Sequence, residues 1–261
     1  MKRRDLFLYS SAALGSLLTG SAGAAEKDDA APAWTYEPLD GKETAQRAYD
    51  LYSEGSCMYA AFRSIVSLVG EKRVAKHPGE SAQWNGFPYY MMKYGKGGVH
   101  DYGSLCGILN GCAAAISLFV PERKDAAVLT HALFHYYENT PLPVFMPTEP
   151  KFGGIVQSRS ESVLCHVSVT RWAIASDETA ESPRRKERCK RLVGDLTAKT
   201  GEMLNSYFAD KDKCLASGAA AAESPAGHCA ECHNPEGDQP QVNVKMNCTP
   251  CHSDIGPDHG N

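Results

Sequence analysis

The sequence predicts a mainly α-helical protein, in which a helical cysteine-rich domain is followed by an irregular C-terminal tail. Two observations predict this class: apolar residues recur at helical spacing from Thr44 to about Phe208, and almost no large apolar side chains follow His228. With 261 residues, of which 43% are hydrophobic, the chain can bury a real core. The formal charge is −4, and the basic residues of Arg184–Lys190 are interpreted as a solvated helix face, so a nucleic-acid partner is not expected.

The first residues are predicted to form an export signal rather than part of the fold. Arg3-Arg4 precede an uncharged run from Leu6 to Ala25, with the small-residue site Ala22-Gly23-Ala24 near its end. This pattern is typical of a secretory signal peptide, and the paired arginines favour the twin-arginine route over an ordinary secretory one. We expect residues 1–25 to be removed on export to the periplasm, which leaves no membrane span, although the run is long enough for a retained anchor.

Four stretches of the domain, placed at 26–215, carry the apolar stripe of an amphipathic helix. The stripes are Met58, Phe62, Ile65, Val66 and Val69; Leu105, Ile108, Leu109, Cys112, Ile116 and Phe119; Leu129, Ala132, Leu133 and Tyr136; and Cys189, Leu192, Val193, Leu196, Met203 and Tyr207. Pro121 and Pro141 end the second and third helices. A further helix is favoured over Ser162–Ser176, where a Val-Ser-Val-Thr centre also has strand propensity. His77–Asp101 is predicted to be a loop rich in Gly and aromatic residues.

Small residues at 216–227 are predicted to form a linker, and 228–261 to form the tail. The tail has too few apolar side chains to fold alone, so something else must supply its core. It contains Cys229-Ala230-Glu231-Cys232-His233 and Cys248-Thr249-Pro250-Cys251-His252. This spacing is the one that c-type haem attachment requires, because two thiols add across the two vinyl groups of the porphyrin and the adjacent His ligates iron.

The tail is therefore predicted to bind two covalent haems, which supply its missing core. Cys229 and Cys232 would attach one haem, and Cys248 and Cys251 would attach the other. The proximal iron ligands would be His233 and His252, which directly follow the second cysteine of each motif. A zinc ribbon is the alternative, since 15 residues separate Cys232 from Cys248 and the four thiols match the ribbon template. A ribbon, however, has no reason to place His after both second cysteines.

The distal iron ligands are less constrained by spacing. The candidates are Met246 and the histidines His77, His100, His131, His135, His166, His228 and His259. We favour His100, in the glycine-rich loop shortly before Cys106, and His166, which follows Cys165. Ligation by two histidines would lower the reduction potential relative to Met/His ligation. His131 and His135 lie four residues apart on one helix face. Surface histidines on a polar face explain such a pair more often than iron ligation does.

Six cysteines lie outside the haem motifs: Cys57, Cys106, Cys112, Cys165, Cys189 and Cys214. In an exported protein an even set first suggests disulfides. These cysteines, however, lie at or in helices of a domain large enough to need no cross-links, and four grouped thiolates suit an iron–sulfur cluster. The favoured quartet is Cys57, Cys106, Cys165 and Cys189, since Cys112 lies on an apolar stripe and Cys214 is peripheral.

A family resemblance adds to this interpretation. The run Gly97-Gly98-Val99-His100-Asp101-Tyr102-Gly103-Ser104-Leu105-Cys106-Gly107, with Gly111-Cys112-Ala113, resembles a family of cysteine-rich helical redox proteins named for its C-GCAxxG-C-C pattern. Cys165 and Cys189 look like its later cysteines, whereas Ile116 stands where the second glycine would fall. Such a domain followed by two C-x-x-C-H motifs resembles the split-Soret cytochromes c. The resemblance implies a homodimer with its haems gathered at one end, an axial His donated across the dimer, and an additional non-haem iron or iron–sulfur centre.

These features favour an electron carrier, in which the haems relay single electrons and exchange them with the cluster. The alternative is a haem-based reductase of a small oxyanion or peroxide, which needs an open axial position on one iron. A redox sensor or storage protein is a third possibility. Removing the signal takes away three basic residues and one acid, so the remaining chain is more acidic. This favours redox partners that have a basic docking face.

Overall fold

A computed structural model of the chain describes residues 34–221, 229, 233, 236 and 245–252. The predicted signal peptide at 1–25, Cys232 of the first haem motif and residues 222–227 of the predicted linker lie outside the described residues.

Helices make up almost all of the regular structure in the described part of the chain. They are α1 Gly41–Lys76, α2 Ser81–Asn85, α3 Gly107–Phe119, α4 Arg123–Asn139, α5 Cys165–Ser176, α6 Pro183–Ala209 and α7 Lys211–Ala221, with the 3-10 helices η1 Pro78–Glu80 and η2 Tyr89–Gly95. Within these residues, β pairing is limited to two isolated antiparallel bridges, Leu105 with Leu164 and Leu142 with Ser158. The mainly α prediction is confirmed.

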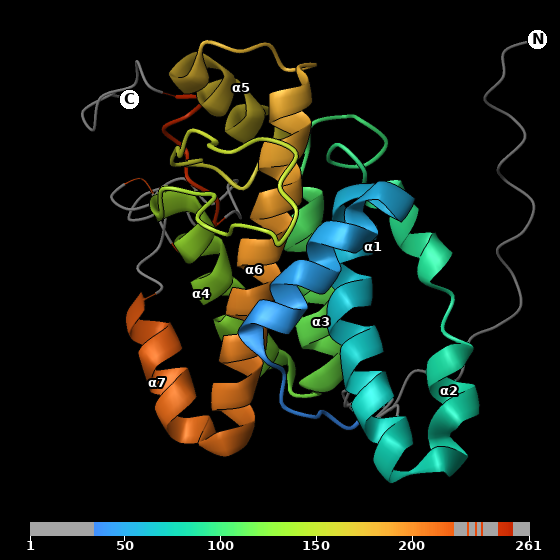
Figure 1. Cartoon of the computed structure of the whole chain (residues 1–261). Coiled ribbons are helices and arrows are strands. Elements are labelled where there is room, and N and C mark those ends of the chain that lie inside the picture. The colour runs from blue at the N-terminus through green and yellow to red at the C-terminus, as the bar shows by residue number, and fades with distance from the viewer. Residues whose placement is uncertain (1–33, 222–228, 230–232, 234–235, 237–244, 253–261) are drawn as a thin grey trace, which may run out of the picture. The chain divides into compact units, whose positions relative to one another are not determined.

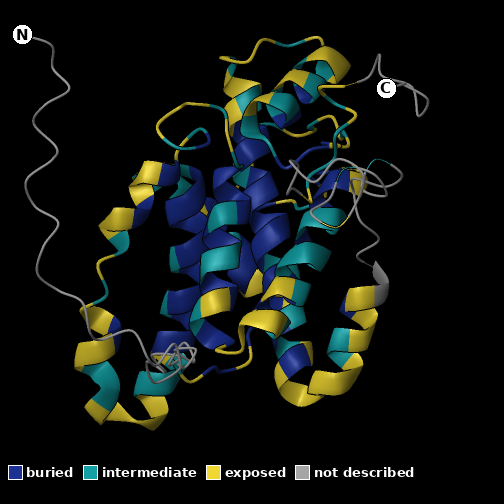
Figure 2. Ribbon diagram, turned by 180° about the vertical axis from the view of Figure 1, so that it is seen from behind, coloured by how far each residue is buried: buried dark blue, intermediate teal, exposed yellow. Residues whose placement is uncertain are grey.

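The core lies where α1, α3 and α6 meet. α1 packs along both α6 and α3, α4 packs on α3, and α7 folds back against α4 and α6 (Figure 1). Buried residues are concentrated on the helices at the centre of the bundle (Figure 2). The predicted apolar stripes supply this core: Ile65, Leu109 and Leu196 each have a relative exposure of 0%. No helix among the described residues is both long and apolar enough to cross a bilayer.

α1 consists of two halves joined at a kink. The first half is capped by Asp40, whose Oδ1 accepts a hydrogen bond of 2.8 Å from the Glu43 N–H. Ser56 interrupts the helix with φ 70° and ψ −161°. It follows Gly55, and a Gly/Ser pair is a common cause of a sharp helix kink. The second half therefore starts at Cys57, which gains the position of a helix N-terminus in the middle of a long helix.

Three segments differ from the sequence prediction. The segment His77–Asp101, expected to be a loop, contains η1, α2 and η2. The helix expected from Ser162 starts at Cys165, because Leu164 is extended and pairs with Leu105. Residues 216–221, expected to belong to the linker, are helical, because α7 continues to Ala221. Alanine has the highest helix propensity, and Gly218 of this helix lies against the Val128 side chain of α4. The segment 216–221 is therefore helical and packed on the domain.

Candidate metal centre and haem site

Three of the four favoured cysteines stand at helix starts. Cys57 begins the second half of α1, Cys106 is the N-cap of α3, and Cys165 is the first residue of α5. The first turn of a helix has unpaired N–H groups and carries a partial positive charge, which stabilises a nearby anion. The helix N-termini therefore offset part of the cost of a thiolate, the form of cysteine that binds metals, although burial raises the pKa of all three thiols.

Cys106 and Cys165 are held together by the backbone. The Cys106 N–H donates to the Val163 carbonyl at 2.8 Å, and the Cys165 N–H donates to the Ser104 carbonyl at 2.7 Å. These two hydrogen bonds form the bridge between Leu105 and Leu164 and bring the starts of α3 and α5 side by side.

Cys57 approaches the same space because a glycine follows Cys106. A Cβ atom on Gly107 would lie 3.0 Å from the Cβ of Cys57 and 2.3 Å from the carbonyl oxygen of Gly95. Any larger residue at 107 would push the second half of α1 away from the start of α3.

The electrostatics of the thiols show that all four favoured cysteines are neighbours. Burial raises the pKa of Cys57 to about 11, and the charges of Cys189 and Cys106 raise it further. The pKa of Cys165 is raised by burial first and then by the charges of Cys106, Cys189 and Cys57. The structure therefore brings together the quartet that the sequence predicts.

The four thiols are near one another without enclosing a single ion. Among the described residues, no three His, Cys, Asp or Glu side chains are close enough to surround one metal ion. A cluster with bridging sulfides is wider than a single ion, so thiols spread around a small space fit it better.

A buried cation lies beside this quartet. Arg188 has a relative exposure of 2%, and its Nη1 lies 4.0 Å from the Sγ of Cys189. Its Nη2 donates to the Ser168 hydroxyl at 2.8 Å, whereas its Nε is buried and has no hydrogen-bond partner in the described chain. No carboxylate of a described residue forms an ion pair with it. A buried charge is costly unless an anion balances it, and the thiolates of a metal centre would supply that anion. The donor set therefore fits an iron–sulfur centre.

The burial of Arg188 corrects the sequence interpretation of Arg184–Lys190 as a solvated helix face. Glu187 is only 1% exposed and pairs with Arg191, whose Nε lies 2.9 Å from the Glu187 Oε1. The start of α6 contacts both α1 and α5, because Tyr49 of α1 donates to Glu187 and Arg188 donates to Ser168 of α5, and these charged residues are enclosed.

The glycine-rich loop connects η2 to the quartet. Residues 97–101 all have positive φ, including Val99 at 61° and His100 at 46°. This conformation is unfavourable for non-glycine residues, and here hydrogen bonds hold it: the Gly103 N–H donates to Gly97 at 2.9 Å, and the Ser104 hydroxyl donates to Gly98 at 2.9 Å.

The two favoured distal histidines lie on the loop side of this centre. His100 and His166 are both exposed. The Nδ1 of His166 lies 3.0 Å from the Gly103 carbonyl oxygen, which leaves Nε2 as the ring atom available to a metal. Because both rings are at the surface, a haem would have to be brought to them from outside the helical core.

The described parts of the two haem motifs form helical turns. The His252 N–H donates to the Cys248 carbonyl at 3.0 Å, and the His233 N–H donates to the Cys229 carbonyl at 2.9 Å. The pKa of Cys248 is raised by burial and then by the charge of Cys229 and a hydrogen bond to it. The first cysteines of the two motifs are therefore adjacent.

The second motif is attached to the helical domain. The Asn247 side chain donates to the Glu161 carbonyl at 3.0 Å and accepts the Thr249 N–H at 3.1 Å, which caps the turn of the motif. Met246 packs against the hydrophobic core. This places the second motif close to the start of α5.

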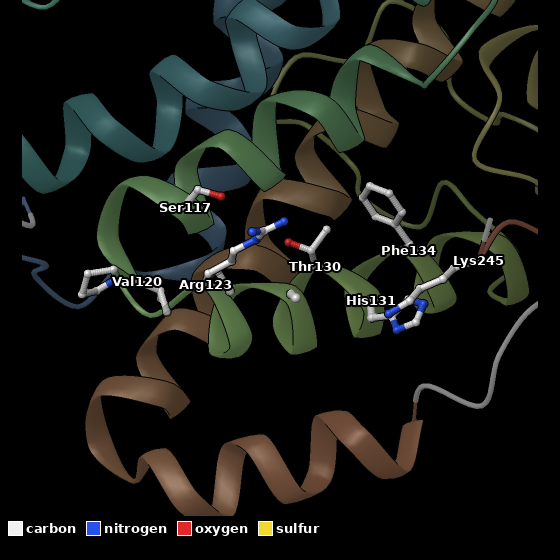
Figure 3. Close-up of a pocket in the computed structure, with 10 residues that line it drawn as sticks. Ser117, Val120, Arg123, Thr130, His131, Phe134 and Lys245 are labelled. Carbon is white, nitrogen blue, oxygen red and sulfur yellow. The ribbon is translucent and has the colours of Figure 1, made fainter. Parts of the chain in front are cut away.

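A cavity of about 500 Å³ lies between the end of α3 and α4 (Figure 3). His131 and Lys245 meet at one end of it, and the Nε2 of His131 is buried with no hydrogen-bond partner among the described residues. The pKa of His131 is lowered by burial first and then by the charges of Lys245 and His135. The sequence interpretation set this histidine aside as a surface residue. The sequence feature that could have singled out His131 is its spacing of four residues from His135.

The remaining described cysteines have other surroundings. Cys112 is 0% exposed in the core, and burial raises its pKa to about 12. The Cys214 thiol contacts the Met203 carbonyl oxygen. None of the nine described cysteines is in a disulfide.

Comparison with known proteins identifies the family to which the chain belongs. A family model described as "Putative redox-active protein (C_GCAxxG_C_C)" matches residues 85–203. The chain is also 39% identical over 253 residues to the split-Soret cytochrome c of Desulfovibrio desulfuricans (strain ATCC 27774), which covers 92% of this chain and 87% of that protein. The chain belongs to the split-Soret cytochrome c family. A solved structure of the cytochrome from that organism, described as having a novel iron centre, matches this family member with a TM-score of 0.74. The match has 36% identity and covers 87% of this chain and 93% of the other. The predicted family and the helical fold class are thus confirmed.

Proposed function

We propose that this member of the family is an exported electron carrier with two c-type haems and an iron–sulfur centre. The observation that carries the proposal is the convergence of Cys57, Cys106, Cys165 and Cys189 beside the buried Arg188, whose Nε has no hydrogen-bond partner among the described residues. The novel iron centre of the relative from Desulfovibrio desulfuricans supports a further iron site besides haem.

The haem groups would be attached to the tail. Cys229 and Cys232 would hold one haem and Cys248 and Cys251 the other, with His233 and His252 as proximal ligands. When bound, haem supplies one-electron oxidation and reduction. The contact between Cys229 and Cys248 supports two haems that lie close together, and the tie between Asn247 and Glu161 supports haems held against the helical domain.

The distal ligands are proposed to be His100 and His166, in a homodimer. Both rings are exposed, and the Nδ1 contact of His166 orients its Nε2 for a metal. An exposed histidine of one subunit can reach a haem of the other, which supports the donation across a dimer that the family resemblance implies. We expect sedimentation of the purified holoprotein to give twice the mass of one chain.

Export by the twin-arginine route is consistent with this set of cofactors. That route carries folded proteins, often with a cofactor inserted in the cytoplasm, whereas c-type haem is attached after export. An iron–sulfur centre inserted before export would therefore explain Arg3-Arg4. Replacing both arginines with lysine should leave the protein in the cytoplasm without covalent haem, as cell fractionation and haem staining would show.

Iron analysis and spectroscopy of the purified protein test the proposal as a whole. We expect clearly more than two irons per chain, a low-spin haem spectrum that carbon monoxide does not change, and a separate paramagnetic signal after reduction. Two irons per chain with the six other thiols oxidised in pairs would remove the cluster. A five-coordinate, high-spin haem would favour the reductase of a small oxyanion or peroxide instead.

A further inference from the structure

A cavity of about 630 Å³ lies at the kink of α1, directly over one thiol of the quartet. Tyr52 and Ser56 line it, and both contact Cys57: its Sγ donates to the Tyr52 hydroxyl at 3.7 Å and lies 3.8 Å from the Ser56 Oγ. Two lining residues of the cavity therefore touch the Cys57 sulfur, which does not itself line the cavity.

The walls of this cavity are rich in lysine. Five lysines from three separate segments line it: Lys93, Lys96, Lys151, Lys186 and Lys190. Lys186 and Lys190 belong to α6 and lie on either side of Cys189 in the sequence. Lysines from several directions thus converge on one space, although the chain as a whole has a formal charge of −4.

The acidic residues of the cavity do not neutralise these lysines. Its two carboxylates, Glu54 and Glu187, are already paired with arginines: Arg63 lies 2.7 Å from Glu54 and Arg191 lies 2.9 Å from Glu187. Lys96 pairs with Asp101 at 3.0 Å.

The other four lysines form no ion pair with a carboxylate of the described chain. Lys93 and Lys190 instead lie over the rings of Tyr59 and Tyr49. The cavity therefore presents a surplus of positive charge to solvent.

We propose that this lysine-rich cavity is the docking site at which a small acidic redox protein exchanges electrons with the iron–sulfur centre. The proposal rests on the proposed function, which supplies that centre. Charge complementarity selects the occupant, because carboxylates on the partner's surface would pair with lysines that have no such partner within this chain. One electron passes from the reduced partner to the oxidised centre, and no bond is formed or broken.

The docking site reverses the expectation based on net charge. An acidic chain favours basic partners on average, but steering depends on the local field around the entry point, which here is positive. A partner that docks on the lysines also comes close to Cys57, which shortens the path for the electron.

The rate of electron transfer from a small acidic flavodoxin tests this proposal. The flavodoxin is reduced to its hydroquinone and mixed with the oxidised holoprotein in a stopped-flow experiment at increasing sodium chloride. We expect the second-order rate constant to fall with salt, and K186E/K190E to lower it about tenfold at low ionic strength. The single variant K186E, at an exposed position, should give a smaller decrease and guards against misfolding of the double variant.

The matched control is K124E/K213E, which makes the same change of charge at exposed positions on α4 and α7. It should retain a rate within about twofold of the wild type. Equal rates for the cavity and control variants, or a rate that salt does not change, would overturn the docking site. Inhibition by inorganic phosphate at constant ionic strength, as strong as that caused by K186E/K190E, would also overturn it in favour of a site for small anions.

Failure of the docking site can be distinguished from failure of the proposed function. The reduced spectrum reached at equilibrium with dithionite does not depend on protein docking. If that spectrum shows the reduced centre while flavodoxin reacts equally fast with all variants, the proposed electron-carrier function is retained and the proposed docking site is rejected.

Discussion

The Nη1 of Arg188 lies 4.0 Å from the Sγ of Cys189, the residue that follows it in α6. The guanidinium is buried, so solvent screens its charge only weakly. Because it is positive, it should stabilise the reduced and more negative state of the centre. This relationship would make the reduction potential of the proposed iron–sulfur centre sensitive to a residue that is not one of its proposed ligands.

We expect Arg188→Met to lower the potential of the iron–sulfur centre by about 60 mV, which equals roughly 1.4 kcal/mol for a one-electron couple. A potentiometric titration followed by paramagnetic resonance would measure it. Arg184→Met is the matched control, because Arg184 is an exposed residue of the same helix. An unchanged potential in Arg188→Met would mean that the cation acts only on folding.

Alanine substitutions distinguish the quartet from the core cysteine. Cys106→Ala and Cys165→Ala should lose the non-haem iron and its paramagnetic signal while keeping both haems. Cys112→Ala should keep the iron and lose about 1 kcal/mol of stability, since Cys112 is buried in the hydrophobic core. Iron content per haem gives the readout. Loss of iron in the Cys112 variant alone would reassign the site.

The exposed histidines can be tested through the spin state of the haems. His100→Ala and His166→Ala should each open an axial position, which gives a high-spin haem that binds carbon monoxide. His77→Ala is the control, because His77 is an exposed residue at the end of α1. If both test variants stay low-spin, His131, whose buried Nε2 has no hydrogen-bond partner among the described residues, becomes the next residue to replace.

A glycine in the loop should be required for the geometry of the centre. Gly98 has φ +69°, and a Cβ there would lie 2.6 Å from the Ser104 nitrogen and 2.9 Å from the Cβ of Cys165. Gly98→Ala should therefore destabilise the fold by about 2 kcal/mol or more and reduce iron retention. Gly79→Ala has open space around the new methyl group and should change neither thermal stability nor iron content appreciably.

Glu138 should make the stability depend on pH. It is 2% exposed, and burial raises its pKa to about 7 against a smaller lowering by a backbone hydrogen bond from Val163. The folded chain therefore holds a proton that the unfolded chain releases near pH 4.3, so the free energy of unfolding is highest below that pH and falls towards pH 7. The loss is at most about 4 kcal/mol.

Glu138→Gln should remove most of this slope, as urea unfolding between pH 4.5 and 8 would measure. Asp195, whose pKa burial raises to about 6, contributes a smaller slope of the same sign that the variant keeps. Glu149→Gln, at an exposed position, should leave the pH dependence unchanged. A slope that persists in full in Glu138→Gln would contradict the assignment.

Local patterns in the sequence were sufficient for the fold class and the haem motifs. Helical spacing depends on neighbours within one element, and the four predicted stripes lie on helices of the described chain, except for Leu105, which precedes α3. The C-x-x-C-H spacing is equally local, because one porphyrin edge must meet both thiols and the following histidine. The quartet of cysteines could be proposed from residue type and family resemblance, without any geometry.

The tertiary structure alone decided which charged and titratable groups are enclosed. Arg188 and Glu138 are ionisable residues whose side chains are normally solvated, yet packing between helices buries both. The bridge between Leu105 and Leu164 and the approach of Cys57 to Gly107 likewise join segments far apart in the chain. Burial and long-range contact depend on how whole elements pack, and no periodicity within one element contains that information.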